Sequence, residues 1–361
     1  MGNSKRGSNS HENQRRDAEF KIKRQLWMGE KFIIEAKGTG ENVTKAKKYA
    51  EKNFNKNLMG RLNIDSNQSL LPDNLSLALS KYIPIIVSDD GSDIGTLIEK
   101  KLFLEQVSKQ KIEIPLELKA FNFQLEGFKE IFSGAIKNSS RLICGLGSGS
   151  VLETSITLHK TWGVPYIPGS SFKGICRTVA FEYLCENKNL TDEDLETFQE
   201  KFYGELCHDD SDILTWQLLF GAQDFKSLLL FIDAYPVEDG KLDLDIMNNH
   251  YADYYQDKKT PGDWENPVPI FFLTVKENTA FKFNVLFDRW RWEKIKREGL
   301  KIKKGNEEIL LKTIDDGAVE EKVTKVTEEN FIKEIIQEAL EIYGVGSKRN
   351  LGYGMFKIQN N

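Results

Sequence analysis

The chain has 361 residues, enough for two compact units or for one large unit with insertions. Hydrophobic residues make up 40% and charged residues 29% of it, so the chain can build a core and is not disordered throughout. No apolar run approaches the ~20 residues of a membrane-spanning helix, and residues 1–24 lack the hydrophobic stretch of a secretory signal. These properties predict a cytoplasmic location and no membrane partner.

The four cysteines give no sign of a metal site or of a disulfide framework. Cys144, Cys176, Cys185 and Cys207 form no Cys-x-x-Cys pair, and His208 has no companions at the spacing of a zinc finger. We therefore expect reduced thiols, no metal and no cofactor.

The net charge of −5 conceals an uneven distribution of charge along the chain. Residues 1–60 include 14 basic and 7 acidic residues, and residues 282–304 include 9 basic and 3 acidic residues. Residues 190–212, in contrast, include 1 basic and 9 acidic residues. Nucleic-acid binding follows such local patches and not the total charge. On charge alone, however, a solvated face is the commoner explanation of a charged run.

The N-terminal third of the chain is the least informative part. Residues 1–20 are rich in Ser, Asn and charge, and they predict a disordered arm. Residues 21–120 form an N-terminal extension whose fold the sequence leaves open. From Gln124 to Asn138 apolar residues recur at helical spacing, which predicts a helix. A glycine-rich passage follows, from Cys144 to Ser150.

A strand and a helix are expected next. Apolar and polar residues alternate over residues 152–158, the pattern of a strand with one buried face. Turn residues at 162–169 then lead to a helix that Ser170 or Ser171 can cap. The acidic stretch 190–212 interrupts the domain as an insertion.

The remaining elements complete a recognisable order. Leu228–Ile232 has the composition of a buried strand, and residues 271–275 and 281–287 predict a β-hairpin. Thr327 predicts a helix start, and residues 353–358 predict the last strand. From residue 150 the order is that of βαββαβ, which predicts an α+β, ferredoxin-like (RRM-like) domain. We place this domain at residues 121–361, with insertions near residues 187–220 and 240–270.

The first candidate site is the helix start formed by Gly169, Ser170 and Ser171, with Lys173 and Arg177 on the same helix. Free backbone N–H groups at a helix start favour phosphate. Lys173 and Arg177 are one turn apart, on the face opposite the apolar stripe, so this end suits a sugar-phosphate backbone. The alternative is an ordinary capped helix with a solvated face.

The second candidate site is a glycine-rich loop near the end of the chain, which we expect to flank one groove with the first. Its residues are Gly344, Gly346, Gly352 and Gly354, with Lys348 and Arg349 at the tip. It runs from helix to strand, so it is neither a Walker loop nor a dinucleotide fingerprint. If its backbone approaches phosphates, Gly346→Val weakens RNA binding. If the glycines only form a turn, that change lowers the melting temperature alone.

Aromatic residues in the polar segment 245–269 form a third candidate site. Such rings stack on RNA bases or anchor a protein partner. His250 and Asp253 have the spacing of two metal ligands on a helix, but no third ligand accompanies them. The candidates for RNA or subunit contact are His159, His250, Tyr251, Tyr254, Tyr255 and Trp264.

In combination, these features resemble the RAMP superfamily of CRISPR RNA-binding proteins. The resemblance rests on the βαββαβ order, on Pro-Gly-Ser-Ser-Phe-Lys-Gly-x-x-Arg at residues 168–177, and on the glycine-rich loop. Within this superfamily, Leu152–His159, Phe231–Pro236 and Met247–Tyr255, followed by Trp264–Pro269, resemble the family of sixth subunits of the Cmr (type III-B) effector complex. The resemblance covers about residues 140–358.

The resemblance implies a non-catalytic, crRNA-binding subunit of an RNA-guided antiviral complex. Such subunits cap the filament of backbone RAMP proteins toward the 3′ end of the guide, and RNA cleavage is assigned to other subunits. The implied partners are the crRNA, the target RNA and other Cmr subunits, namely the backbone RAMP subunit, the 3′-end RAMP subunit and the small helical subunit. The implied guide-binding residues are those of the first two candidate sites.

Two other functions stay open. An RNA-processing endonuclease of the same superfamily would use a general base, for which His159 is the candidate. The alternative role for His159 is a packed or solvent-facing side chain. The third interpretation is a protein-interaction scaffold with incidental basic patches. Salt-dependent RNA binding separates this scaffold from the other two functions, and a cleavage assay separates those two from each other.

Overall fold

The computed structural model of the chain describes residues 20–23, 33–36, 74–80, 85–88, 94–96, 100–119, 125–150, 152–188, 190–207, 209–249, 260, 267–304, 307–311, 317–328 and 331–358. The chain divides into two units, residues 1–72 with 78–103, and residues 73–77 with 104–361. Residues 1–19 of the predicted disordered arm lie outside the described residues. In the described part no helix has both the length and the apolar composition needed to cross a membrane.

The N-terminal extension, whose fold the sequence left open, contains a four-stranded sheet in the first unit. Its order is β1-β2-β3-β4; β2 and β3 are parallel, and the other two pairs are antiparallel. The strands are β1 (Phe20–Lys23), β2 (Ile33–Ala36), β3 (Ile85–Ser88) and β4 (Ile94–Thr96). Helices α3 (Leu75–Ser80) and α4 (Lys100–Lys109) each begin in one unit and end in the other.

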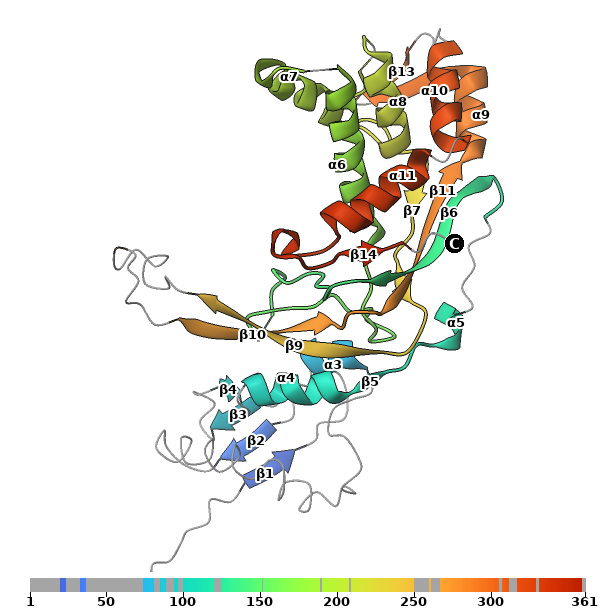
Figure 1. Cartoon of the computed structure of the whole chain (residues 1–361). Coiled ribbons are helices and arrows are strands. Elements are labelled where there is room, and N and C mark those ends of the chain that lie inside the picture. The colour runs from blue at the N-terminus through green and yellow to red at the C-terminus, as the bar shows by residue number, and fades with distance from the viewer. Residues whose placement is uncertain are drawn as a thin grey trace, which may run out of the picture. The chain divides into compact units, whose positions relative to one another are not determined.

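The core of the second unit is an antiparallel sheet in the order β14-β6-β11-β7, with β8 also paired to β11 (Figure 1). Its strands are β6 (Phe128–Asn138), β7 (Leu229–Phe231), β8 (Tyr235–Pro236), β11 (Ala280–Asp288) and β14 (Phe356–Lys357). The predicted strands at residues 228–232, 281–287 and 353–358 are confirmed, although the first and last are shorter than expected.

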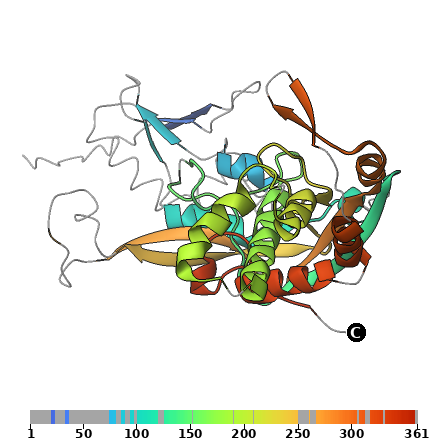
Figure 2. The same ribbon diagram turned by 90° about the horizontal axis from the view of Figure 1, so that it is seen from above.

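Helices α6 (Gly169–Lys188) and α11 (Phe331–Glu338) pack on this sheet and on each other. The Phe172 ring of α6 contacts Phe231 of β7 and Phe283 of β11, with centroid separations of 5.1 and 4.9 Å. Seen from above, α6, α8 (Ser211–Phe220) and α11 gather over the sheet (Figure 2). The predicted helix after the turn at residues 162–169 is confirmed, but it begins at Gly169, so Ser170 and Ser171 lie within its first turn and the prediction that one of them caps it is wrong.

Both expected insertions contain regular structure. The acidic stretch forms α7 (Asp192–Tyr203) and the start of α8. Strands β9 (Gly240–Asn249) and β10 (Val268–Val275) form a long antiparallel ladder, and β5 (Lys111–Ile112) pairs with β9. The other elements are α5 (Leu116–Lys119), α9 (Arg289–Glu298), β12 (Leu300–Lys304), β13 (Glu307–Leu311), α10 (Gly317–Glu328), the π-helical turn η1 (Ala339–Tyr343) and the 3-10 turn η2 (Arg349–Leu351).

The predicted helix over residues 124–138 is wrong, because residues 128–138 are strand β6. Val285 of β11 faces Phe132, but the next residue faces Glu130, so Ile131 is an extra residue in β6. Such a bulge breaks the two-residue alternation of a strand and leaves apolar residues at helix-like spacing. Pairing with the distant strand β11 decides the conformation here.

The predicted strand over residues 152–158 is also wrong. Leu152, Ile156 and Leu158 are buried, as the alternation requires. Glu153, however, has a left-handed backbone with a φ of 66°, which interrupts an extended strand. Leu158 forms an isolated bridge with Pro165 in place of a ladder. The segment is a folded loop, and the first strand of the core sheet is β6 instead.

The predicted hairpin around residues 276–279 is wrong, although both of its strands exist. Strand β10 pairs with β9, and β11 pairs with β6 and β7. The buried side chain of Asn138 organises this passage between sheets. Its Oδ1 accepts a hydrogen bond from Thr279 N at 2.7 Å, and its Nδ2 donates to Lys276 O at 3.1 Å and Ser140 O at 2.7 Å.

Thr327 does not begin a helix, contrary to the prediction. It lies in the last turn of α10, where its hydroxyl donates to Val323 O at 2.8 Å, and α11 begins at Phe331. A threonine hydroxyl bonds a carbonyl one turn earlier as well as capping a helix, so the residue type alone does not separate these roles. The predicted apolar face of the last helix is confirmed, since Ile332, Ile335 and Ile336 are buried.

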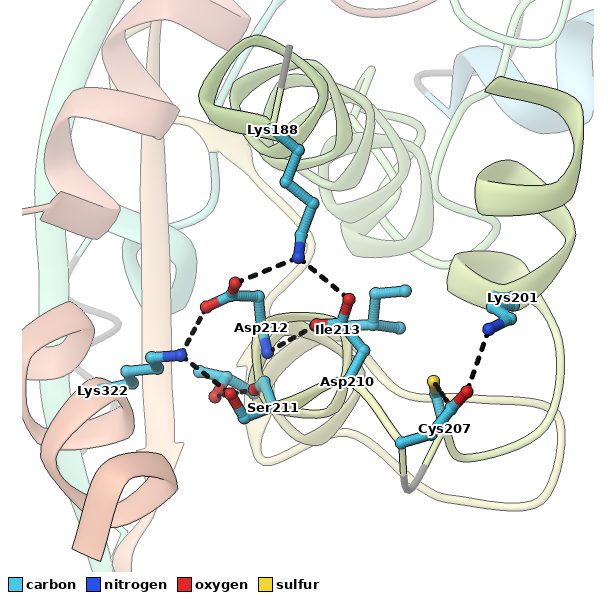
Figure 3. Close-up of polar contacts among 10 residues, drawn as sticks. Lys188, Lys201, Cys207, Asp210, Ser211, Asp212, Ile213 and Lys322 are labelled. Carbon is cyan, nitrogen blue, oxygen red and sulfur yellow. Dashed lines mark hydrogen bonds and ion pairs between the residues drawn. The ribbon is translucent and has the colours of Figure 1, made fainter. Parts of the chain in front are cut away.

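Lysines of two other helices neutralise part of the acidic insertion (Figure 3). Asp210 caps α8, accepting hydrogen bonds from Asp212 N and Ile213 N. Lys188 of α6 lies 2.9 Å from Asp210 and 3.3 Å from Asp212, and Lys322 of α10 pairs with Asp212. These carboxylates therefore fasten α8 to both neighbouring helices.

Lys322→Met should lower the free energy of unfolding by no more than about 1 kcal/mol at neutral pH, the usual range for a partly exposed ion pair. Burial raises the pKa of Asp212, but hydrogen bonds from Lys322 and Lys188 outweigh it and lower that pKa below its ordinary value. The pair therefore stabilises the fold above about pH 4 and loses its effect as the pH falls further. When urea unfolding is measured from neutral to acidic pH, the free energy of unfolding of the variant should fall less than that of the wild type. Lys325→Met, on the same helix, is the control, and an equal change there would contradict the assignment.

Candidate nucleic-acid interface

The carboxylate of Asp233 accepts a hydrogen bond from the backbone at the start of α6. Gly169 N donates to Asp233 Oδ1 at 2.7 Å, and a Cβ at Gly169 would meet the carbonyl oxygen of Phe231. Asp233 thus supplies the negative charge that a helix N-terminus favours. The expectation of free N–H groups is wrong at Gly169, whose role is close packing against β7, and at Ser171, whose N–H donates to Pro168 O at 2.9 Å. Ser170 and Ser171 are exposed.

Lys173 and Arg177 are half-buried and bound within the protein, and not on an open face as expected. Lys173 Nζ donates to Ser227 Oγ at 2.8 Å, and burial lowers the pKa of Lys173. The Arg177 guanidinium lies 4.6 Å from the ring centroid of Tyr203 and donates to Phe202 O at 3.0 Å. Burial also lowers the pKa of Arg177. Both cations thus hold α6 to neighbouring segments, which leaves them little freedom to bind phosphate.

The glycines of the C-terminal loop, residues 344–354, allow close contact with other backbone segments. Each has a positive φ, between 67° and 100°: Gly344, Gly346, Gly352 and Gly354. A Cβ at Gly346 would collide with Ile143 O, and one at Gly354 would collide with Val345 O. Ser347 N also donates to Ile143 O at 2.6 Å. The fold therefore requires these glycines whether or not the loop binds RNA.

Lys348, Arg349 and Gly352 form the accessible part of this loop. The two cations are partly exposed, and neither side chain has a hydrogen bond or an ion pair within the described part of the chain. A Cβ at Gly352 would meet no atom within 4 Å. Unlike Lys173 and Arg177, the charges of Lys348 and Arg349 are available to an anion.

The glycine-rich passage 144–150 connects the two candidate segments. Residues just before it contact the C-terminal loop: Ile143 O accepts from Ser347 N. The passage itself contacts the segment before α6: Cys144 O accepts a hydrogen bond from Thr157 N at 2.7 Å, and residues 152–168 lead directly into α6. The helix start and the loop are therefore parts of one folded region. The groove between them stays a prediction.

Aromatic side chains that lie apart in the sequence come together beside the start of α6. The rings of His159 and Trp162 stack at 4.2 Å, and those of Tyr166 and Tyr235 stack at 5.6 Å. Tyr235 lies edge-on to both His159 and Trp162. Burial raises the pKa of Tyr235 to about 12, and Asp233 acts in the same direction. Sequence reasoning missed both Tyr235 and Asp233, although both lie in Phe231–Pro236, a segment that supported the family resemblance.

Of the third candidate site, His250, Tyr251, Tyr254, Tyr255 and Trp264 lie outside the described residues. Within the described ranges no group of three or more His, Cys, Asp or Glu side chains is arranged to hold a metal ion.

A known protein family matches the part of the chain that contains these segments. The model of the RAMP superfamily matches residues 135–357, from the end of β6 to the last strand of the core sheet. The chain belongs to the RAMP superfamily. The match includes α6, the C-terminal loop, strands β7, β8, β11 and β14, and the end of β6 of this RAMP protein.

Two curated relatives are similar to this RAMP protein and confirm its resemblance to the sixth-subunit family. "CRISPR system Cmr subunit Cmr6" of Pyrococcus furiosus is 29% identical over 326 residues, covering 76% of this chain and 84% of the relative. "CRISPR system CMR subunit Cmr6" of Saccharolobus solfataricus is 25% identical over 259 residues, covering 66% of this chain and 74% of the relative. The crystal structure of Cmr6 from Pyrococcus furiosus, 29% identical, aligns with a TM-score of 0.37 over 66% of this chain and 100% of that chain. A chain of the type III-B Cmr-beta complex bound to cognate target RNA, 19% identical, aligns with a TM-score of 0.42 over 72% of this chain and 71% of that chain.

Proposed function

We propose that this RAMP protein is a non-catalytic, crRNA-binding subunit of a cytoplasmic type III-B (Cmr) antiviral effector complex. In this proposal it caps the backbone filament toward the 3′ end of the guide. Its partners are the guide, the target RNA and the other Cmr subunits, including the backbone RAMP subunit, the 3′-end RAMP subunit and the small helical subunit. The observation that carries the proposal is the 29% identity to a Cmr6 subunit across 84% of that relative.

The proposal includes a ferredoxin-like core. Along the chain the core elements follow the order β6, α6, β7, β11, α11 and β14. The sheet order β14-β6-β11-β7, with antiparallel neighbours throughout, supports a βαββαβ arrangement. Helices α7 to α10 and the β9–β10 ladder are then insertions into this core.

Within the proposed interface the described side chains divide into two groups. Ser170, Ser171, Lys348, Arg349 and Gly352 are accessible, and we assign the RNA contacts to them. The remaining candidates support the fold beneath this surface: Gly169, Lys173, Arg177, Gly344, Gly346 and Gly354. This division rests on the hydrogen bonds and backbone contacts described above.

The contacts of His159 favour a structural role over that of a general base. Its Nδ1 accepts hydrogen bonds from Thr161 N at 3.3 Å and Trp162 N at 3.4 Å, and its ring stacks on Trp162. We therefore propose that the protein does not cleave RNA. Labelled guide and target RNAs incubated with the full chain, with and without Mg²⁺ or Mn²⁺, test this point. Specific cleavage that His159→Ala abolishes would establish the endonuclease function instead.

The decisive test of RNA binding uses the double variant Lys348→Glu, Arg349→Glu. Each lost phosphate contact on a single strand should reduce the dependence of log affinity on log salt by about 0.7. The affinity should fall to a similar extent for unrelated sequences, since phosphate contacts do not read bases. Fluorescence anisotropy with single-stranded RNA at several salt concentrations measures both quantities.

Lys325→Glu is the matched control for this change of charge. Lys325 is exposed on α10 and has no ion pair within the described part of the chain. We expect its effect on affinity to be small. If the double variant binds with unchanged affinity and an unchanged salt dependence, the C-terminal loop is not on the RNA path.

A further inference from the structure

Helix α9 carries an exposed aromatic side chain that the proposed interface does not use. Trp290 is 64% exposed, whereas Trp292, two residues later on the same helix, is 4% exposed. The helix therefore anchors itself through one tryptophan and presents the other to solvent. The helix lies within residues 282–304, where 9 basic residues accompany 3 acidic ones. A single exposed tryptophan is common on protein surfaces, but beside several cations it suits a ligand that combines an aromatic face with negative charge.

The exposed face of α9 places cations beside the indole. Lys294 is one turn beyond Trp290, with its Nζ 5.6 Å from the ring centroid, and Arg297 is one further turn along the same face. Lys294 has no ion pair within the described part of the chain. Arg297 reaches the carboxylate of Glu298 at 3.5 Å, but its side chain stays 74% exposed. Trp290, Lys294 and Arg297 thus form one surface, which we call the α9 face.

Two other cations of the same helix, Arg291 and Lys296, are committed to the fold. Arg291 donates to Ser227 O at 3.0 Å and to Lys226 O at 2.9 Å, and Lys296 pairs with Glu293 and Glu320. The backbone of Trp290 is also fixed, since its N–H donates to Gly127 O at 3.1 Å. The backbone that carries the indole is therefore held in place, which lowers the main-chain entropy lost when a ligand binds there.

The α9 face lies at the opposite end of the core sheet from the C-terminal loop. That loop precedes β14, which pairs with Asn138 at the end of β6. Helix α9 follows Asp288, which pairs with Phe128 at the start of β6. At ~3.3 Å per residue, the 11 residues of β6 separate these two ends by roughly 35 Å. The α9 face is thus a second site, distinct from the proposed interface.

We propose that the α9 face binds single-stranded RNA, with a base stacked on Trp290 and phosphates near Lys294 and Arg297. This inference rests on the proposed RNA-binding function and adds a second contact to it. Single-stranded RNA combines unstacked bases with a regular negative charge, which matches one open ring flanked by two cations. Trp and Arg also occur at protein interfaces, so the choice of RNA rests on charge: the segment 282–304 holds 9 basic residues against 3 acidic ones, which matches a phosphate backbone.

The test compares Trp290→Ala, Trp290→Phe and wild type, all as full chains, in titrations with single-stranded RNA. Removal of one stacking partner should weaken binding about 5- to 150-fold, and Trp290→Phe should restore most of it. Lys294→Gln should reduce the salt dependence by about 0.7, whereas Lys296→Gln, with its amine already paired, should leave it nearly unchanged. Thermal unfolding should show near wild-type stability for Trp290→Ala, because the indole is exposed.

The outcomes separate this inference from the function on which it rests. A wild-type chain with no measurable affinity for RNA at low salt would refute the RNA-binding function itself. Wild-type binding that Trp290→Ala leaves intact would refute only the α9 site. If Lys294→Gln and Lys296→Gln change the salt dependence of RNA affinity equally, the α9 face contributes only nonspecific electrostatic attraction, and the proposal is overturned. A Trp290→Ala variant that binds RNA normally but fails to assemble with the other Cmr subunits would also overturn the proposal, because the α9 face would then be a protein-binding surface.

Discussion

Gly346→Val is expected to lower the free energy of unfolding by about 2–6 kcal/mol, from strain at a positive φ and from overpacking. The backbone at Gly346 has a φ of 100°, and a new Cβ would collide with Ile143 O. Because the neighbour is a backbone carbonyl, no side-chain rotation relieves the collision. Equilibrium unfolding in urea measures the loss. RNA affinity measured below the melting temperature should stay near that of wild type.

Gly352→Val is the matched control in the same loop. It has a φ of 86° but open space where a Cβ would lie, so it should suffer the strain of about 1–3 kcal/mol without the collision. If both variants lose the same stability, the contact with Ile143 is not important. If Gly346→Val instead weakens RNA binding while the protein stays fully folded, the loop is a phosphate clamp at that glycine.

Asn138→Ala is expected to lower the free energy of unfolding by about 2–4 kcal/mol, because it removes the partner of three backbone groups near the core. The amide of Asn138, which is fully buried, binds Thr279 N, Lys276 O and Ser140 O. These bonds fix the chain where it leaves β10 and enters β11. Thermal and urea unfolding of the full chain test the prediction.

Asn187→Ala provides the comparison for the asparagine variant. Asn187 is exposed near the end of α6, and its amide makes a local hydrogen bond to Tyr183 O at 2.7 Å. Its removal should change stability by less than about 0.5 kcal/mol. Similar losses in the two variants would mean that the Asn138 network contributes little beyond an ordinary surface hydrogen bond.

Local patterns predicted the elements whose conformation depends on neighbouring residues. The turn before Gly169 and the serines after it predicted α6, and a continuous apolar run predicted β7. The glycine-rich loop was also predictable, because positive φ angles favour glycine wherever the chain turns sharply.

The errors arose where pairing between distant segments decides the structure. The bulge at Ile131 gave β6 a helix-like spacing, and only β11 supplies the partner that makes it a strand. Two strands four residues apart predicted a hairpin, yet each pairs with a different segment. Asn138 fixes the segment between β10 and β11, and no sequence pattern around it predicts this role.

The sequence by itself determined the family, the core elements α6, β7 and β11, and the residue types at the candidate interface. Short motifs preserve that information because turns, caps and glycine conformations are local properties. Only the tertiary structure decided which cations are free. Burial and specific partners commit Lys173 and Arg177 to the fold, whereas Lys348, Arg349 and Lys294 remain available to an anion. That difference depends on Ser227, Phe202 and Tyr203, which are distant in sequence and adjacent only after folding.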